Sequence, residues 1–95
     1  SKPSTYYGEN AKYTNSLVAD GCFIEGEVEN SILFRGVHVK KGARVSNCIL
    51  MQSTVVKEDV ILKYAITDKN VTIEPGRMLM GHVNYPIAVE KNAVV

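Results

Sequence analysis

The chain has 95 residues, of which 45% are hydrophobic and 22% are charged, and its eleven basic and ten acidic side chains leave a formal net charge of +1. These values are typical of one small folded domain and argue against a disordered chain. The charges are scattered, so no basic stripe indicates a nucleic acid or an anionic membrane as a partner. No apolar run approaches the roughly 20 residues that a membrane helix needs, and the polar opening Ser1–Ser4 is unlike a signal peptide.

A six-residue repeat runs along almost the whole chain. Each hexad begins with a large apolar, aromatic or β-branched residue and has a small or β-branched residue four positions later, with Arg77 as the exception. Shorter sides, in which the next leading residue follows five positions later, as Leu50 follows Val45, separate pairs of hexads. Two sides of six residues and one of five give a coil of 17 residues, which is the spacing of Asn30, Asn47 and Tyr64. The hexads begin at Tyr7, Val18, Leu33, Val39, Leu50, Val56, Thr67, Ile73, Val83 and Val89.

This repeat predicts a parallel β-helix with three sides. An α-helix would need apolar residues about every 3.6 positions, and the pattern does not supply them. Three sides per coil form a triangular prism whose coils stack at roughly 4.8 Å. The leading residues should then point inward in three columns. The predicted columns are Val18, Leu33, Leu50, Thr67 and Val83; Ile24, Val39, Val56, Ile73 and Val89; and Val28, Val45, Leu62 and Leu79.

Small polar residues should form the corners of the prism. Glycine and asparagine recur at the third or fourth position of the hexads, where they suit turns with positive φ. These residues are Gly21, Gly36, Gly42, Asn70 and Gly76. Asn15, Asn30 and Asn47 recur at another corner and could stack as a ladder.

Two places break the repeat. The hexad after Ile24 is cut to four residues before Val28. Near the end, Gly81 and His82 are predicted to shorten the third side before Val83, and the Tyr85-Pro86 pair disturbs the start of the next strand. We therefore expect a loosened last coil.

The two cysteines, Cys22 and Cys48, fall in different columns of the predicted stack. Small buried thiols are the simpler interpretation, and a disulfide is the alternative. Free thiols favour a reducing compartment, so we expect a cytoplasmic protein.

The repeat resembles the hexapeptide family of left-handed β-helices. The expected fold class is therefore all-β, a single-stranded left-handed parallel β-helix of about five coils. The handedness is implied by the resemblance, because parallel crossovers are otherwise right-handed.

Longer stretches resemble the C-terminal domain of glucose-1-phosphate adenylyltransferase, also called ADP-glucose pyrophosphorylase. They are NSLVADGC (15–22), IEGEVENSILFRGV (24–37) and VSNCILM (45–51). The resemblance covers about residues 5 to 95. Gln52 after Met51, together with the stretches Asp68–Arg77 and Asn84–Pro86, resembles the regulatory-type chains of bacterial glycogen synthesis rather than the catalytic ones.

The resemblance implies a larger parent protein, of which residues 1–95 are the β-helix domain and from which an N-terminal nucleotidyltransferase domain is missing. The parent reaction would convert ATP and glucose 1-phosphate into ADP-glucose and pyrophosphate, with magnesium. The implied partners are the parent's own catalytic domain and a catalytic subunit, within a homo- or hetero-oligomer. No catalytic, metal-binding or cofactor-binding residue is expected within these 95 residues.

A hexapeptide-repeat acyltransferase is the alternative function. Such enzymes use a histidine as general base, and the candidates here are His38 and His82. Carbonic anhydrases of this superfamily need three histidines on zinc, which two histidines cannot supply. An ice-binding β-helix would show a threonine column, and Thr54, Thr67 and Thr72 do not align in one.

One group of basic residues is a candidate contact for a phosphorylated effector. Lys40, Lys41 and Arg44 lie close together in the sequence, and Arg35 comes one side earlier. Lysine and arginine are the usual partners of phosphate groups. Ordinary surface charge, balanced by nearby glutamates, is the other interpretation.

Overall fold

The computed structural model describes residues 4–95, so residues Ser1–Pro3 of the predicted polar opening lie outside the described residues. The regular elements of the described chain are fifteen short β-strands. Each coil contributes one strand to each of three five-stranded parallel sheets. The parallel β-helix predicted from the repeat is confirmed.

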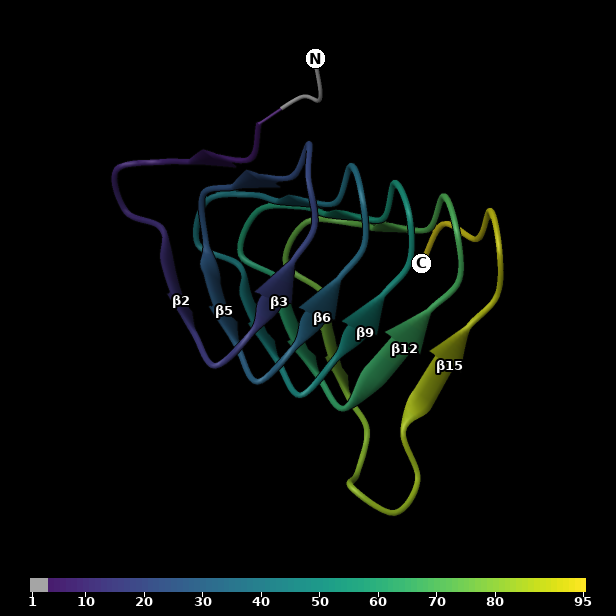
Figure 1. Ribbon diagram of the computed structural model, residues 1–95. Helices are drawn as coiled ribbons and strands as arrows, with labels where there is room; N and C mark the ends of the chain where they lie inside the picture. The colour runs from purple at the N-terminus through teal and green to yellow at the C-terminus, as the bar shows by residue number, and fades with distance from the viewer. Residues whose placement is uncertain (1–3) are drawn as a thin grey trace.

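The three sheets form the sides of a prism. Figure 1 shows the strands of one side next to one another, with the chain advancing from one end of the stack to the other. Sheet A contains β1 (Tyr6–Tyr7), β4 (Phe23–Ile24), β7 (His38–Val39), β10 (Val55–Val56) and β13 (Thr72–Ile73). Sheet B contains β2 (Lys12–Thr14), β5 (Glu27–Glu29), β8 (Arg44–Ser46), β11 (Ile61–Lys63) and β14 (Met78–Met80). Sheet C contains β3 (Leu17–Val18), β6 (Ile32–Leu33), β9 (Ile49–Leu50), β12 (Ala65–Thr67) and β15 (Ile87–Val89).

The inward columns form the core. The column on sheet B is confirmed in full, since the strand register pairs Val28 with Val45, Val45 with Leu62 and Leu62 with Leu79. The first four members of the other two columns are also confirmed by their register. The leading residues of the middle coils are buried, as are small residues such as Cys22, Val37 and Ala43. Alternation along each short strand thus places one apolar residue inside per side.

The last coil differs from the prediction. Val83 is 64% exposed and does not join the column on sheet C; Val89 takes that place and pairs with Thr67. Val89 was therefore assigned to the wrong column, and Val95 follows Ile73 instead, because the amide of Glu74 donates to the carbonyl oxygen of Val95 (2.7 Å). The predicted register is six residues out of step from Val83 onward.

A five-residue insertion causes this shift. Gly81 occupies the same corner as Tyr64, and its amide donates to the carbonyl oxygen of Lys63 (2.7 Å). Residues 82–86 then leave the stack as a hairpin closed by an antiparallel bridge between His82 and Tyr85, and the chain rejoins sheet C at β15. Figure 1 shows this loop extending beyond the prism. The prediction that Gly81-His82 shortens the third side is wrong, because the side is lengthened at its corner.

The corners adopt the predicted positive φ. Gly21, Gly36, Gly42, Asn70 and Gly76 have φ between 58° and 80°. Asn15, Asn30, Asn47 and Tyr64 occupy another corner, with φ between 48° and 55°. The amide group of Asn15 donates to Oδ1 of Asn30 (2.7 Å), so the first two members of the predicted asparagine ladder are joined through their side chains.

The shortened hexad after Ile24 depends on Gly26. This glycine is buried, and a Cβ at its position would lie within 2.8 Å of the carbonyl oxygens of Lys40 and Ala43. The missing side chain lets the chain cut across the corner, while the amide of Glu27 still donates to the carbonyl oxygen of Ala43 (2.9 Å). Two residues are lost there without breaking the stack.

Candidate functional site

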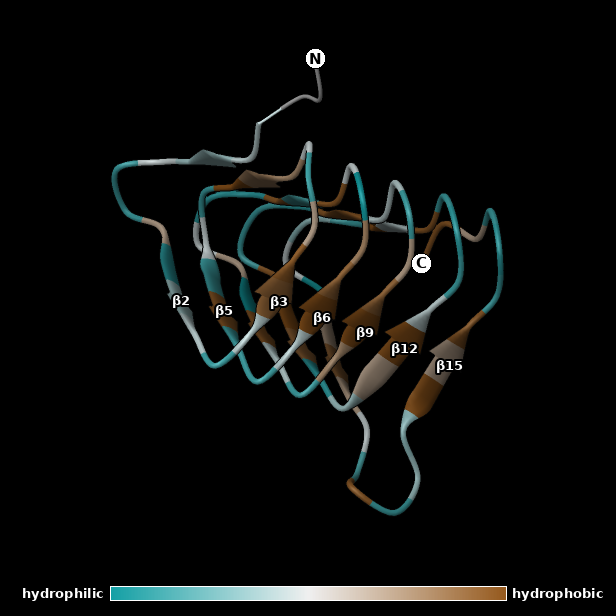
Figure 2. Ribbon diagram, viewed as in Figure 1, coloured by the Kyte–Doolittle hydropathy of each residue, from teal (hydrophilic) through white to brown (hydrophobic). Residues whose placement is uncertain are grey.

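The outward side of sheet C carries one apolar residue from every coil. The strand register places Leu17, Ile32, Ile49, Ile66 and Ala88 in one column, which we call the apolar column. Leu17 is 69% exposed, and the three isoleucines are between 37% and 40% exposed. In Figure 2 the strands β3, β6 and β9 are coloured as hydrophobic along their length.

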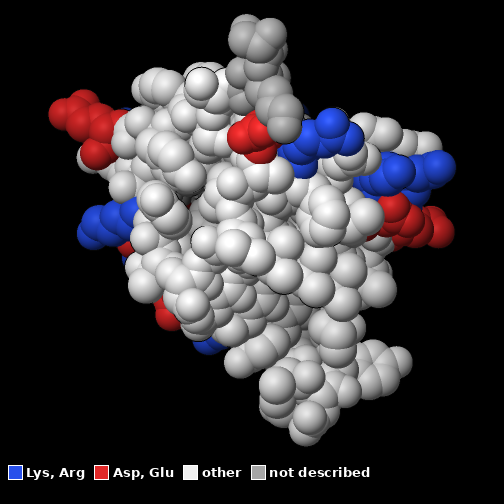
Figure 3. Space-filling model, viewed as in Figure 1, with Lys and Arg blue, Asp and Glu red and all other residues white. Residues whose placement is uncertain are grey.

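The apolar column is widened by its neighbours. Phe34 and Met51 follow the inward residues of β6 and β9, and Phe34 is 38% exposed. In Figure 3, which looks at this side of the prism, the charged side chains lie around the margin and the centre is free of them. Sheet C therefore presents a continuous apolar strip to the surface.

A hollow lies at the C-terminal end of the strip. Ala88 is the smallest member of the apolar column, and a shallow groove of about 450 Å³ opens around it. Met51, Ile66, Thr67, Asp68, Ala88, Val89 and Glu90 line this groove. The hairpin at residues 82–86 rises beside it, since Tyr85 and Pro86 border a neighbouring recess that also includes Ala88.

Sheet B differs sharply from sheet C in its first three coils. Its outward positions carry Lys12, Glu27 and Arg44 in one column, and Arg44 Nε lies 3.2 Å from Glu27 Oε2. The fourth position is Ile61, which is half-buried. The same coil geometry thus accepts charged outward residues, so the fold itself does not require the apolar column of sheet C.

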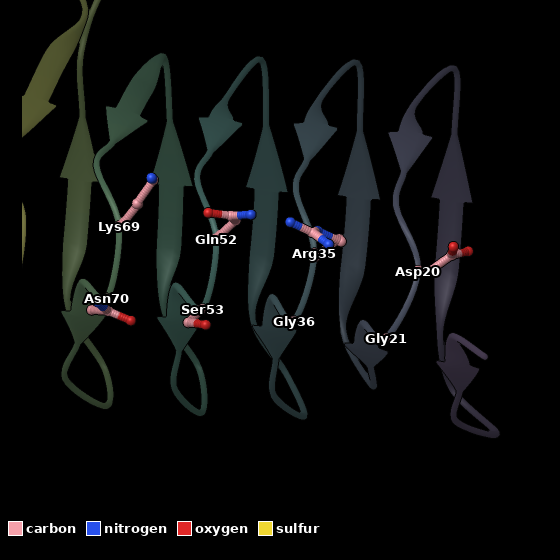
Figure 4. Close-up of a pocket in the computed structure, with 8 residues that line it drawn as sticks. All are labelled: Asp20, Gly21, Arg35, Gly36, Gln52, Ser53, Lys69 and Asn70. Carbon is pink, nitrogen blue, oxygen red and sulfur yellow. The ribbon is translucent and has the colours of Figure 1, made fainter. Parts of the chain in front are cut away.

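A groove of about 540 Å³ follows the corner between sheets C and A. Figure 4 shows that Asp20, Arg35, Gln52 and Lys69 occupy equivalent places on four successive coils. The residues that follow them at the corner, Gly21, Gly36, Ser53 and Asn70, complete the lining. Arg35 and Lys69 give this groove two basic groups next to the apolar strip.

The four basic residues predicted as an effector contact are not brought together. Arg35 lies in the corner groove, whereas Lys41 borders a different recess together with Glu25. Lys40 follows β7 on sheet A, and Arg44 is paired with Glu27 on sheet B. An effector contact made by these residues stays a prediction.

The histidines lie far apart in the fold. His38 is half-buried on the outer side of sheet A, where its ring stacks on Phe23 (centroids 5.4 Å apart), and Phe23 stacks on Tyr6 (4.4 Å). His38 is therefore packed on a flat face of the prism. His82 is exposed in the extruded hairpin.

The two cysteines are free and buried, as expected for small core residues. Burial raises the pKa of the Cys48 thiol to about 11, and the thiol donates to the carbonyl oxygen of Ser46 (3.2 Å). Burial also raises the pKa of Cys22, whose thiol donates to the carbonyl oxygen of Phe34 (3.2 Å). Both groups are therefore held as protonated thiols at neutral pH, and neither is an activated nucleophile.

Sequence reasoning missed the apolar strip, although a signal was present. The pairs Leu17-Val18, Ile32-Leu33 and Ile49-Leu50 each place two large apolar residues side by side in a short strand. Because successive side chains of a strand point to opposite faces, one member of each pair must face outward.

Across residues 4–95, no helix is long and apolar enough to cross a membrane, and no group of three or more His, Cys, Asp or Glu residues could hold a metal ion.

Comparison with known proteins agrees with this architecture. A family model described as GlmU-like, C-terminal hexapeptide matches residues 4–84. The chain is 47% identical over 93 residues to the glycogen biosynthesis protein GlgD of Bacillus subtilis (strain 168), covering 98% of this chain and 27% of that protein. It is 35% identical over 83 residues to glucose-1-phosphate adenylyltransferases of Bacillus cytotoxicus and Bacillus thuringiensis (strain Al Hakam), covering 87% of this chain and 22% of each relative.

The chain spans about a quarter of the length of these relatives. The resemblance to the C-terminal domain of glucose-1-phosphate adenylyltransferase, predicted from residues 15–22, 24–37 and 45–51, is confirmed. The hexapeptide repeat, the three-sided parallel stack and the match across residues 4–84 lead to one assignment: the chain belongs to the GlmU-like C-terminal hexapeptide family.

Proposed function

We propose that this chain is the assembly and regulatory domain of a glucose-1-phosphate adenylyltransferase-like protein of glycogen biosynthesis. The observation that carries the proposal is the 47% identity with GlgD, which extends over 98% of this chain. The parent reaction would join ATP and glucose 1-phosphate to give ADP-glucose and pyrophosphate, with magnesium. The residues for that chemistry would lie in a nucleotidyltransferase domain outside this chain, in the same polypeptide or in a partner subunit.

The surface of the domain supports an assembly role. The apolar strip on sheet C is typical of a surface that packs against further protein. The outermost strands β14 and β15 also lack a strand on their far side within the described chain, and such edges favour contact with another protein segment. Covering these surfaces would stabilise both the β-helix and its neighbour.

A regulatory-type parent is favoured over a catalytic one because three parts of the sequence resemble the regulatory-type chains. Gln52 follows Met51 at the edge of the corner groove, and Asn84–Pro86 lie in the extruded hairpin. The stretch Asp68–Arg77 forms the corner and strand that join sheet C to sheet A in the last coil. A regulatory chain would act by binding a catalytic chain of the same family.

The test uses the full polypeptide that contains this domain. It should be co-expressed with a separate catalytic chain of the glucose-1-phosphate adenylyltransferase family, and pyrophosphate release from ATP and glucose 1-phosphate should be measured. We expect the two chains to co-purify, and the rate or effector response of the catalytic chain to change on binding. A polypeptide that is fully active alone would contradict the regulatory assignment.

An acyltransferase is the second candidate, and the extruded hairpin favours it. His82 is exposed at the base of this hairpin, where a loop could border an acyl-donor site. Turnover of acyl-CoA that is lost in a His82→Ala variant would support this candidate. Its absence in the full polypeptide would exclude it.

A further inference from the structure

We propose that the corner groove between sheets C and A binds a linear chain of glucose units, the α-1,4-glucan of which glycogen is built. The inference deepens the proposed function, and the choice of glucose among the hexoses rests on that function. The match to a polymer of hexoses rests on the groove alone, on its two rows of residues, their spacing and their charge.

The groove is lined by two parallel rows of residues, each with one member from four successive coils. Figure 4 shows the first row as side chains that extend from the coils at equivalent places, Asp20, Arg35, Gln52 and Lys69. The second row consists of the corner residues that follow them, Gly21, Gly36, Ser53 and Asn70. Two glycines and a serine leave the groove open, and its volume of about 540 Å³ is within the range of sites for small molecules.

The polar groups of the first row are available to a ligand. Within residues 4–95, the side chains of this row take part in no ion pair and in no side-chain hydrogen bond. Asp20, Arg35 and Lys69 are exposed, and Gln52 is half-buried. The row therefore offers an acceptor, two donors and an amide that does both. Because a sugar hydroxyl both donates and accepts, this mixture of groups suits a carbohydrate.

The spacing of the row favours one kind of polymer. Successive coils lie about 4.8 Å apart, and a hexose unit of a linear glucan advances its chain by about the same distance. An extended peptide presents side chains to one face about every 6.6 Å, so it would be out of step with the coils after one repeat. Four coils span about 14 Å, which corresponds to about three or four glucose units.

The charges in the groove argue against a phosphorylated ligand. Arg35 and Lys69 are two coils apart, about 10 Å, with the neutral Gln52 between them and the carboxylate of Asp20 at one end. A polyanion would gain from consecutive cations, and Asp20 would repel it. A neutral chain of hydroxyl groups can use the whole row, since a carboxylate and a guanidinium can each bind two neighbouring hydroxyls.

An aromatic ring lies next to the polar row. Phe34 directly precedes Arg35 and is 38% exposed on the outer side of sheet C. The faces of a glucose ring carry C–H groups, which pack against the negative face of an aromatic ring, whereas the hydroxyls project from its rim. An apolar surface beside a row of hydrogen-bonding groups therefore matches the two kinds of surface that a glucan presents.

Native electrophoresis of the full polypeptide through gels that contain glycogen tests the inference. We expect glycogen to retard the wild type, because its many chains let several weak contacts act together. Gln52→Ala and Arg35→Ala should each weaken the apparent affinity about fivefold, the usual effect of one lost hydrogen bond. Arg44→Ala removes an exposed arginine of sheet B and is the matched control, with unchanged retardation. No retardation of the wild type, or equal retardation of all four proteins, overturns the inference.

The salt dependence separates a glucan from an anion. Hydrogen bonds to a neutral sugar are not screened, so raising the ionic strength from about 0.05 to about 0.5 M should change the apparent affinity less than about twofold. Gln52→Ala keeps the charge of the groove, and its effect should persist at both ionic strengths. Retardation that disappears at the higher ionic strength would contradict the inference.

Protection of lysines in the wild-type polypeptide locates the site without any substitution. The protein is acetylated with and without maltotetraose, and the rate at each lysine is read by mass spectrometry. We expect maltotetraose to slow the acetylation of Lys69 about threefold or more and to leave Lys41, an exposed lysine at another corner, unchanged. Equal rates at Lys69, or protection by inorganic phosphate in place of maltotetraose, would overturn the assignment.

The outcomes separate this inference from the proposed function. A polypeptide that binds and regulates a catalytic chain but is not retarded by glycogen would remove the glucan site alone. A polypeptide that binds glycogen through the corner groove but has no effect on ADP-glucose formation would remove the proposed function alone.

Discussion

The hydroxyl groups of Thr54 and Thr67 lie 2.8 Å apart in the core, where both residues are fully buried. Thr67 occupies a column that Leu33 and Leu50 fill in the preceding coils. Thr54 Oγ1 also donates to the carbonyl oxygen of Met51 (2.9 Å), so the hydrogen between the two hydroxyls comes from Thr67. The pair is therefore asymmetric, because the Thr54 hydroxyl also has the carbonyl oxygens of Met51 and Asp68 (3.4 Å) within hydrogen-bond distance.

This asymmetry predicts unequal effects of two similar substitutions. Thr54→Val leaves the buried hydroxyl of Thr67 without a partner and should lower the free energy of unfolding by about 1–3 kcal/mol. Thr67→Val removes one hydrogen bond but leaves the bond from Thr54 to Met51 in place, so it should lower the free energy of unfolding by less, about 0.5–1.5 kcal/mol. Urea denaturation of both variants and of the double variant measures the interaction free energy between the two hydroxyl groups. Equal losses in the two single variants would contradict the asymmetry.

Gly26→Ala should destabilise the chain more than Gly76→Ala. The new Cβ at position 26 would meet the carbonyl oxygens of Lys40 and Ala43 in a buried corner, and overpacking of this kind costs about 1–3 kcal/mol or more. At position 76 a Cβ would meet nothing within 4 Å, and the cost arises from the positive φ of 74°, at about 1–2 kcal/mol. Thermal unfolding of the two variants compares them. A smaller loss at position 26 would show that the shortened corner can widen.

The stability of the chain should fall at alkaline pH because of Cys48. Burial raises the pKa of its thiol from 9.0 to about 11, so the folded state favours the protonated form. The contribution of this group to the free energy of unfolding is therefore complete below pH 9 and is lost as the pH rises through about 11. Urea denaturation at pH 8 and pH 10.5 should show a larger decrease for the wild type than for Cys48→Ala. The decrease that remains in the variant reflects groups such as Cys22 and Tyr7, whose pKa values are also raised by burial.

Deletion of residues 82–86 should restore a regular last coil. The deletion would place Val89 five positions after Leu79, the same spacing as between Leu62 and Thr67. Gly81 already occupies the corner position of Tyr64, and loop length alone has a small effect on stability. We expect the free energy of unfolding of the shortened chain to lie within about 1 kcal/mol of the wild-type value. A loss of cooperative unfolding would show that the hairpin supports the coil.

The repeat allowed the first four coils to be predicted almost completely, because their inward residues recur at fixed intervals. The last coil was misassigned because Val83 and Val89 are six residues apart, so either one can continue the hexad pattern. Only tertiary structure decides between them: the chain leaves the stack after Gly81 and returns at Ile87, whose amide donates to the carbonyl oxygen of Tyr64 (2.9 Å).

The surface was less predictable than the core. The predicted basic group contains residues that are neighbours in the sequence, yet Lys41 and Arg44 lie on different parts of the prism because a corner separates them. The apolar strip escaped prediction for the opposite reason, since its members are about a coil apart in the sequence and adjacent in space.

The position of the hairpin has a practical consequence. It leaves the prism at one corner and returns there, so the strands on either side keep their partners whatever lies between them. Tyr85, near its tip, is 84% exposed. The corner after Gly81 is therefore suited to the insertion of foreign peptides. An epitope, a fluorophore-binding peptide or a short affinity tag inserted between residues 82 and 86 should be displayed in a fixed direction on a rigid support.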